Sequence, residues 1–454
     1  MEAFYPLPVP FTSMQTIELL VVPRWLVPVE PADQVYQDHA LAVDGGRIRD
    51  VLPLPFAKQL YAPREVLELP HHALLPGLVN AHTHAAMTLL RGLADDLPLM
   101  DWLQNHIWPA EARHVGYAFC ADGVRLAAAE MIRGGTTCFN DMYFFPDATA
   151  AVIAEIGLRA VLGLIVLDFP SAWAANWQDY IHRGLELHDR LKGTPLVRTI
   201  FAPHAPYSVG DAALERLRVL ADELGLGIHM HVHETAAEVA EAVKASGKRP
   251  WQRLRELELL GENFLAVHMT QLDTEEIAEA ARLGVSVAHC PESNLKLASG
   301  FCPVARLRAA GVNVALGTDG AASNNDLDLW SEMRTAALLA KAVSGSAAAL
   351  PAAEALRMAT LAGARALGLE DEIGSLTPGK SADFIAVDLS APATQPVYHV
   401  LSQLVYAASR EQVSHVYVAG RALMRERRLL TLDEAETLAR AAQWRARIAS
   451  TNPS

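Results

Sequence analysis

Eight apolar, strand-like runs alternate with helical patterns through the middle of the chain, and this alternation constrains the fold more than any other feature. Such βα repeats are typical of α/β proteins with a parallel sheet, and eight of them predict a closed (β/α)8 barrel of the TIM type. The active site of such a barrel lies at the carboxyl ends of its strands. The predicted strands span Leu74–His84, Thr136–Asp141, Ala160–Asp168, Val197–His204, Gly227–Glu234, Phe264–Thr270, Val285–Asn294 and Val312–Asp319.

Shorter β-branched runs with turns flank the barrel region on both sides. On the N-terminal side they predict a small antiparallel sheet, with Asp44-Gly45-Gly46 as a hairpin turn. The same pattern of short β-branched runs and turns returns near the C-terminal end. We therefore predict one small domain built from residues 1–68 plus 373–454, which ends in a helix, and a catalytic barrel of residues 69–372. The flanking runs are Thr16–Val22, Ala40–Val43, Arg47–Leu52, Ser381–Asp388 and Val413–Val418.

Composition excludes several classes of function. The formal charge of −14, without a basic cluster, argues against nucleic acid and anionic membranes as partners. No apolar run is long enough to span a bilayer, and Met1–Thr12 lacks the basic start and cleavage site of a signal peptide. The four cysteines, Cys120, Cys138, Cys290 and Cys302, show no CxxC spacing. We therefore expect a cytoplasmic protein with reduced thiols.

Two histidines end the first predicted strand. His82 and His84 share one face because side chains alternate along a strand, and such a pair either binds a metal or only caps the strand. A ring of polar residues at the other strand ends favours a metal site. The candidate ligands for one divalent metal are His82, His84, His231 and Asp319, and we expect that metal to be zinc. No strand ends in a lysine that could bridge a second metal, and the same ligands also accept manganese, iron or nickel.

Three residues near these ligands suit catalysis. Glu234 is a carboxylate not needed as a ligand, which makes it a candidate general acid and base. Asp319 could accept a proton from an attacking water. His268 is either a core histidine or a group that stabilises the attacked centre. His229 and His233 are either structural or face the pocket.

Several stretches together resemble the amidohydrolase superfamily over nearly the whole chain. They are Pro76–His84, the histidines of the fifth and sixth strands, Leu316–Gly320 and Gly374–Asp383. The resemblance implies a small composite β-sandwich domain beside the barrel.

Within that superfamily the chain looks most like the 5′-methylthioadenosine/S-adenosylhomocysteine deaminases. The supporting stretches are Leu90–Leu103, Trp108–Glu111, Ala202–Tyr207 and His289–Leu297. The resemblance implies one zinc ion on the four ligands, and nucleoside contacts from Glu111, His204 and Trp102. It implies that Glu234 protonates the purine while activated water attacks the carbon bearing the amine, assisted by His268 and Asp319. It also implies a homo-oligomer, either a dimer or a tetramer.

Alternatives remain open from the sequence. Another deaminase or chlorohydrolase of the same architecture would act on guanine, cytosine, an unmodified nucleoside or a triazine, and a catalytically silent barrel would act on nothing. Trp102 and Trp108 either meet a ligand or only pack their helix. The segment 169–177 offers aromatic rings and no arginine before Arg183, which predicts a preference for methylthioadenosine over S-adenosylhomocysteine, unless the segment never touches substrate.

Overall fold

A computed structural model describes residues 14–451 of the chain. The interpretation of Met1–Thr12 lies outside these residues. Within them, every helix is too short or too polar to cross a lipid bilayer.

Eight parallel strands, each paired with the next in chain order, form the centre of the molecule and confirm the predicted barrel. The barrel closes between its last and first strands, where the amide of Asp319 donates to the carbonyl of His82 at 3.1 Å. The strands are rich in Val, Ile, Leu and Ala and are almost completely buried, as expected for a parallel sheet covered on both faces. They are β5 (Leu78–Thr83), β6 (Thr136–Asp141), β7 (Arg159–Val166), β8 (Val197–Pro203), β9 (Ile228–Val232), β10 (Phe264–His268), β11 (Ser286–His289) and β12 (Val314–Leu316).

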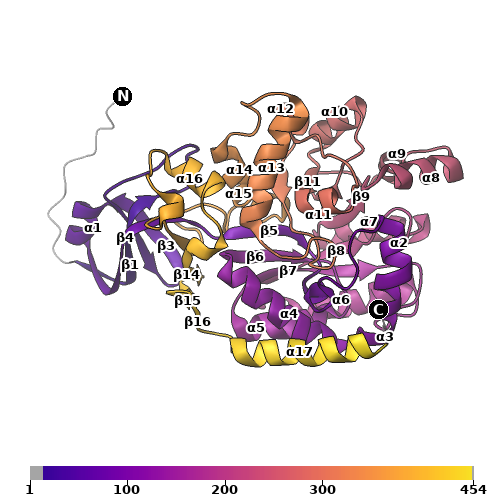
Figure 1. The fold of residues 1–454 in the computed structure, drawn as a ribbon, viewed down its shortest axis with the longest axis horizontal. Coiled ribbons are helices and arrows are strands. Elements are labelled where there is room, and N and C mark those ends of the chain that lie inside the picture. The colour runs from indigo at the N-terminus through magenta and orange to yellow at the C-terminus, as the bar shows by residue number, and fades with distance from the viewer. Residues whose placement is uncertain (1–13, 452–454) are drawn as a thin grey trace.

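Helices follow the strands and surround the barrel (Figure 1). Their ends carry local signals: in α10, for example, Asp273 and Glu276 form a capping box and Gly284 closes the helix at a φ of 76°. These helices are α4 (Tyr117–Arg133), α5 (Pro146–Ile156), α6 (Trp177–Leu191), α7 (Asp211–Leu224), α8 (Ala236–Ser246), α9 (Pro250–Glu256), α10 (Thr274–Leu283), α11 (Pro291–Lys296), α12 (Val304–Ala309), α13 (Leu329–Ser344), α14 (Ala352–Met358) and α15 (Leu361–Ala366).

Several of the predicted strands are shorter than expected; the run Val312–Asp319, for example, is a strand only over Val314–Leu316. For two of them the cause is a single residue. The run Leu74–His84 is divided at Gly77, where a Cβ atom would lie 2.0 Å from the Thr137 hydroxyl oxygen, so only glycine fits. The run Val285–Asn294 stops as a strand at His289, because Pro291 lacks an amide donor and instead begins α11.

A second, eight-stranded sheet joins both ends of the described chain, in the order β16-β15-β14-β13-β4-β1-β2-β3. The sheet is mixed, so the prediction of an antiparallel sheet is wrong for one pair: β1 and β4 run parallel because the chain crosses over through β2, β3 and α1 before β4 begins. The elements are β1 (Gln15–Leu26), β2 (His39–Asp44), β3 (Arg47–Pro53), α1 (Leu54–Leu60), β4 (Tyr61–Pro76), β13 (Phe384–Asp388), β14 (Val413–Val418), β15 (Arg421–Arg425) and β16 (Arg428–Leu429).

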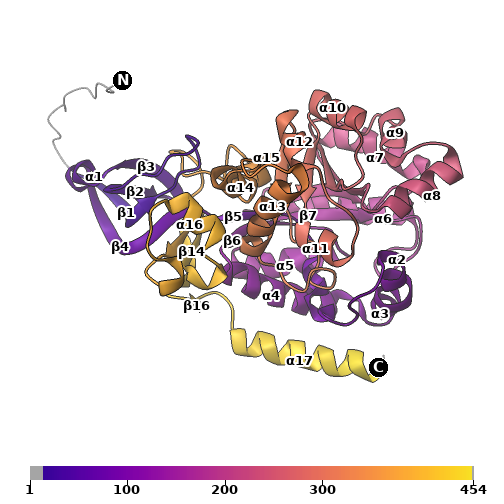
Figure 2. The ribbon, with the colours of Figure 1, turned by 45° about the horizontal axis from the view of Figure 1, so that its top comes forward.

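Apolar residues from both ends of the chain share one core in this domain. Leu41 and Leu19 from the N-terminal strands pack in the same cluster as Phe384 and Tyr417 from the C-terminal strands. Figures 1 and 2 show the domain to one side of the barrel, which confirms the expected extra domain built from both ends. Its precise limits at residues 68 and 373 stay a prediction, and β4 continues past the first of them to Pro76.

The C-terminal helix α17 (Glu434–Thr451) leaves this domain and runs along the barrel beneath α4 (Figure 1). The indole nitrogen of Trp444 donates to the Asp122 carboxylate of α4 at 2.9 Å, which ties the helix to the barrel. Three short helices lie between the strands of the C-terminal part: η3 (Pro392–Thr394), α16 (Val400–Tyr406) and η4 (Arg410–Gln412).

The long connection between β5 and β6 forms one wall of the mouth of the barrel, and we call residues 85–114 the lid segment. A turn of π-helix in its middle ends two residues before Pro109. Pro109 has no amide hydrogen, and its ring would clash with the carbonyl of Asn105 if an ordinary helix continued through it. The lid segment contains η1 (Ala85–Leu90), α2 (Leu99–Asp101), η2 (Trp102–Ile107) and α3 (Trp108–His114).

Candidate active site

Three imidazoles and one carboxylate converge at the carboxyl ends of β5, β9 and β12. The possible ligand atoms of His82, His84, His231 and Asp319 all lie within 4.8 Å of one another. The Nε2 atoms of His82 and His84 are each 3.2 Å from Asp319 Oδ1, and His231 Nε2 is 3.2 Å from His82 Nε2. Four side chains from three strands therefore point at one place.

The spacing of these atoms fits a divalent metal ion. Ligands about 2.1 Å from a tetrahedral zinc ion are about 3.4 Å from one another, close to the distances found here. The second ring nitrogen of His84 contacts the carbonyl of Met142, and that of His231 lies 2.8 Å from the carbonyl of His204. These bonds hold both Nε2 atoms toward the cluster, as is usual for histidine ligands.

The charges of the cluster also suit a metal ion. Burial lowers the pKa of His82 to about 4 and that of His231 far below its ordinary value. Burial alone would raise the pKa of Asp319, but hydrogen bonds from His82 and His84 hold it well below the ordinary range. Burial opposes protonation of His84 as well, but its hydrogen bond with Asp319 raises its pKa. Divalent metals bind neutral imidazole and ionised carboxylate, so a metal ion would take the place of the proton between His84 and Asp319.

Glu234 follows β9 and lies at the edge of the cluster, with 6% of its surface exposed. Burial raises its pKa, and the nearby imidazole of His268 opposes that rise. The Oε2 atom of Glu234 is 3.8 Å from Nε2 of His268. The amides of His233 and Glu234 donate to the Glu238 carboxylate at 3.2 and 2.7 Å, which fixes the backbone that carries Glu234. A carboxyl group whose pKa is raised can both give and take a proton during a reaction.

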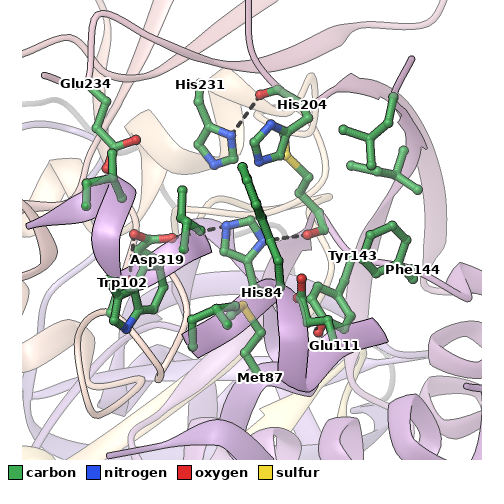
Figure 3. A pocket seen from close by; sticks show the side chains of 18 of the residues that line it. His84, Met87, Trp102, Glu111, Tyr143, Phe144, His204, His231, Glu234 and Asp319 are labelled. Carbon is green, nitrogen blue, oxygen red and sulfur yellow. Dashed lines mark hydrogen bonds and ion pairs between the residues drawn. The ribbon is translucent and has the colours of Figure 1, made fainter. Parts of the chain in front are cut away.

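A cavity of about 830 Å³, counted with its open mouth, connects this cluster with a second carboxylate on the lid segment. Tyr143 donates its hydroxyl proton to Glu111 Oε1 at 2.7 Å, and burial raises the pKa of Glu111 to about 7. Figure 3 shows Glu234 on one side of the cavity and Glu111 with Tyr143 on the other, with His84 and Asp319 between them. His204 also lines the cavity, with its Nδ1 atom 2.9 Å from the Ser208 hydroxyl.

The wall beyond the metal cluster is apolar. Trp102 is 6% exposed, and the ring of Trp108 lies 6.3 Å from that of Phe169 across the mouth. Apolar side chains of the lid segment form one part of this wall, and side chains at or after the carboxyl ends of β6 and β7 form another. They are Leu99, Trp102, Leu103, Ile107 and Trp108 on the lid side, and Phe144, Ile165, Leu167 and Phe169 on the barrel side.

The structure brings the predicted site residues together. Trp102, Glu111, His204, Glu234 and His268 line the cavity with three of the predicted ligands, and His82 lies beneath them. The individual roles of these residues stay a prediction.

Two histidines that the sequence left ambiguous lie behind the site. His229 is buried with its Nε2 atom 2.9 Å from His82 Nδ1, whereas His233 points away and accepts the amide proton of Trp251 at 3.2 Å. Sequence reasoning missed Tyr143, which stands two residues after Asp141. Its place just after the carboxyl end of a barrel strand, where active-site residues gather, could have identified it from the sequence.

The segment 169–177 divides between two surroundings. Phe169 lines the cavity, whereas Trp173 packs against Tyr180 of α6 at 5.7 Å between ring centroids. The first arginine after it, Arg183, donates to the Asp179 carboxylate at 3.0 Å. Only the start of the segment can therefore meet a ligand.

Comparisons with known proteins agree with this geometry. A "5-methylthioadenosine/S-adenosylhomocysteine deaminase" of Teredinibacter turnerae is 50% identical over 96% of this chain and 99% of its own. A crystal structure of an adenosine deaminase from Xanthomonas campestris with bound zinc matches with a TM-score of 0.96 and 56% identity, covering 96% of this chain and all of that one. The atrazine chlorohydrolase of Arthrobacter aurescens shares the fold, with a TM-score of 0.88 and 22% identity over 94% of this chain and 99% of that one. The sequence pattern of the amidohydrolase family matches residues 73–423, and with the closed barrel and its histidine cluster this match establishes that the chain belongs to the amidohydrolase family.

Proposed function

We propose that the protein is a metal-dependent aminohydrolase that replaces the amino group of the adenine ring in 5′-methylthioadenosine and related adenosines by oxygen, releasing ammonia. One observation carries the proposal: a single cavity holds a metal-binding cluster with Glu234 at one side and a half-buried carboxylate, Glu111, at the other. Such a cavity can take a purine at the cluster and a sugar at Glu111. The names of the similar proteins support the same substrates.

His82, His84, His231 and Asp319 would hold one divalent ion, and we propose zinc, as in the Xanthomonas campestris structure. A bound zinc ion supplies a water molecule whose pKa is lowered toward about 7. The side chains around it would handle the protons. Glu234, with its raised pKa, donates a proton to the purine ring nitrogen beside the attacked carbon.

The remaining proton transfers fall to two further residues. Asp319, which is ionised, accepts the proton of the attacking water and returns it to the departing amine. His268 lies 3.8 Å from Glu234 and stabilises the attacked centre from the side of β10. The second proton of the water, left on the oxygen of the adduct, returns to Glu234 as the C–N bond breaks, so both carboxyl groups end as they began. The net change adds one water and releases one ammonia.

The other end of the cavity would recognise the nucleoside. Glu111 can accept hydrogen bonds from two ribose hydroxyls, and Tyr143 keeps its carboxylate in place. His204 offers its free ring nitrogen to the substrate, since Nδ1 is held by Ser208. The ring of Trp102 gives a flat apolar surface beside the ligand.

We further propose that methylthioadenosine is preferred over S-adenosylhomocysteine. Within the described part of the chain, the residues that line the cavity include no lysine or arginine, and Arg183 is already paired. The carboxylate of homocysteine would enter an apolar wall that also carries Glu111, and would have no cation to bind. A methylthio group needs only the apolar contacts that Leu103 and Phe169 provide.

Ultraviolet absorbance tests this function directly. Purified, zinc-loaded protein is incubated in parallel with methylthioadenosine, S-adenosylhomocysteine, adenosine and guanine, and ammonia is assayed in each reaction. We expect conversion of adenine to hypoxanthine, with a kcat/KM at least about tenfold higher for methylthioadenosine than for S-adenosylhomocysteine. Equal constants contradict the preference. Turnover of guanine alone contradicts the substrate class.

We also propose where the enzyme is located and how its chains assemble. We propose a cytoplasmic enzyme, because Cys120, Cys138, Cys290 and Cys302 are all buried free thiols. We propose a homodimer or homotetramer with a small-molecule nucleoside as its substrate. Sedimentation of the purified protein measures the assembly.

A further inference from the structure

Helix α11 carries two consecutive side chains that reach the proposed proton-handling groups without facing the substrate. The Ser293 hydroxyl donates to Asp319 Oδ2 at 2.7 Å. The amide oxygen of Asn294 is 2.9 Å from Nδ1 of His268. Ser293 is completely buried and Asn294 is 1% exposed, so both contacts are shielded from water.

The position of α11 explains how neighbouring residues reach two different strands. The helix follows β11, which lies between β10 and β12 in the barrel. Successive residues of a helix point about 100° apart. Ser293 can therefore face the end of β12, where Asp319 lies, while Asn294 faces the end of β10, where His268 lies.

The contacts of Asp319 divide its carboxylate into two halves. Its Oδ1 atom faces the Nε2 atoms of His82 and His84, each at 3.2 Å. Its Oδ2 atom accepts from the hydroxyls of Ser293 and Ser323, at 2.7 and 2.9 Å. Neutral donors on Oδ2 hold the plane of the carboxylate without cancelling its negative charge.

The contact of Asn294 decides which ring nitrogen of His268 carries the proton. An amide oxygen can only accept, so Nδ1 of His268 must donate to it. The lone pair of Nε2 then points into the cavity toward Glu234, so the ring can take up a proton at Nε2 as negative charge develops on the attacked centre. A leucine in place of Asn294 would leave Nδ1 without a partner and the ring free to turn.

The backbone conformation of His268 and Asp319 gives a further reason why side-chain contacts are needed to hold them. His268 has a φ of 74° and Asp319 a φ of 59°, both in the left-handed region that non-glycine residues rarely adopt. Each such residue costs about 1–3 kcal/mol and persists only where surrounding contacts determine it. The side-chain contacts of α11 are among those that hold the two residues in this conformation.

We propose that Ser293 and Asn294 are positioning residues: Ser293 orients the Asp319 carboxylate for metal binding and proton transfer, and Asn294 fixes the His268 ring with its proton on Nδ1. The proposal rests on the proposed function for the catalytic roles of Asp319 and His268.

Two substitutions of Asn294 separate positioning from simple structure. We expect Asn294→Leu to lower kcat about 10–100-fold, with KM and zinc content changed less than threefold. Asn294→Asp keeps an acceptor at the same place, so its kcat should stay within about tenfold of the original. Leu295→Ala, on the exposed side of the same helix, is the matched control and should change nothing. An Asn294→Leu enzyme with full kcat, or an Asn294→Asp enzyme as slow as Asn294→Leu, overturns the role of Asn294.

Zinc affinity tests Ser293. Competition with a chromogenic chelator should show zinc binding about 10–100-fold weaker in Ser293→Ala. If this variant does not fold, Ser293→Gly, which removes the same hydroxyl, is measured in its place. Affinity within threefold of the original overturns the role of Ser293.

A spectroscopic measurement keeps this inference separate from the proposed function. In protein with ¹⁵N-labelled histidine, the signals lost in His268→Gln identify His268 and show which ring nitrogen bears its proton. We expect Nδ1–H, and Nε2–H overturns the proposal. If the original protein deaminates no nucleoside, the proposed function fails, whereas the zinc affinity and the proton position still decide whether α11 positions these groups.

Discussion

The two ends of the active-site cavity are built in different ways. At the metal end, the side chains come from strand ends, are buried, and are held by hydrogen bonds, such as that between His231 and the carbonyl of His204. At the lid end, Trp102, Leu103 and Phe169 come from helices and a loop and are held by apolar packing. Hydrogen bonds fix angles, whereas packing tolerates changes of shape. The difference suggests that the barrel fixes the reaction and the lid end selects the substrate.

Removal of one candidate metal ligand should abolish both metal binding and activity. His231→Ala deletes a ligand from the centre of the cluster, so zinc content should fall and kcat/KM should drop at least about 10⁴-fold, since a metal supplies several kcal/mol to such reactions. Metal analysis and the absorbance assay measure both effects. His182→Ala, on the exposed surface of α6, is the control. A variant that keeps its zinc and its rate contradicts the assignment of His231.

Loss of the proposed proton donor should be severe while the metal stays bound. Glu234→Gln keeps the shape of the side chain but removes its proton, and we expect kcat to fall about 10³-fold with one zinc per chain. Glu241→Gln, exposed on α8, should behave as the original protein. A kcat within tenfold of the original would show that a group other than Glu234 donates the proton.

The candidate ligands at the metal end could be predicted from the residues themselves, whereas nucleoside contacts from Trp102 and Glu111 at the lid end were expected only from the family resemblance. His82 and His84 alternate on a strand, and strand ends of a barrel must meet, so chain order alone placed the ligands. The pairing of β1 with β4 and the Tyr143–Glu111 contact depend on how distant segments pack, and no local pattern encodes that. The turn of π-helix at η2, just before Pro109, likewise lies within a helical pattern that periodicity alone predicts as ordinary helix.

Glu111 should make stability depend on pH. Its pKa is about 7 in the folded protein against an ordinary value of 4.5, so folding favours the protonated form. That contribution is complete below pH 4.5 and is lost as the pH rises through 7, a change on the order of 3 kcal/mol. We therefore expect Glu111→Gln to raise the melting temperature at pH 8 but not at pH 4.5. Glu155→Gln, an exposed pair partner of Arg125, should raise it at neither pH.

The same carboxyl should make substrate binding depend on pH in the opposite direction. Only the ionised form accepts two hydrogen bonds from a ribose. With a pKa of about 7, most Glu111 is ionised at pH 8 and little at pH 6, so KM for methylthioadenosine should rise about tenfold as the pH falls across this range. Glu111→Gln should show a high KM with no such dependence. A KM that falls toward pH 6 would contradict the ribose contact.

A charge placed at the lid end should change selectivity without harming the reaction. Phe169 is 43% exposed at the mouth, so an arginine there can keep its guanidinium in contact with water and still reach the end of a bound substrate. We expect Phe169→Arg to raise kcat/KM for S-adenosylhomocysteine severalfold and to lower that for methylthioadenosine by a similar factor, because a solvent-exposed ion pair contributes about 1 kcal/mol or less. Phe169→Leu is the matched control and should keep the original preference. If Phe169→Arg slows both substrates equally, the wall at Phe169 does not contact the 5′ substituent, and the selection of substrate must lie elsewhere in the lid segment.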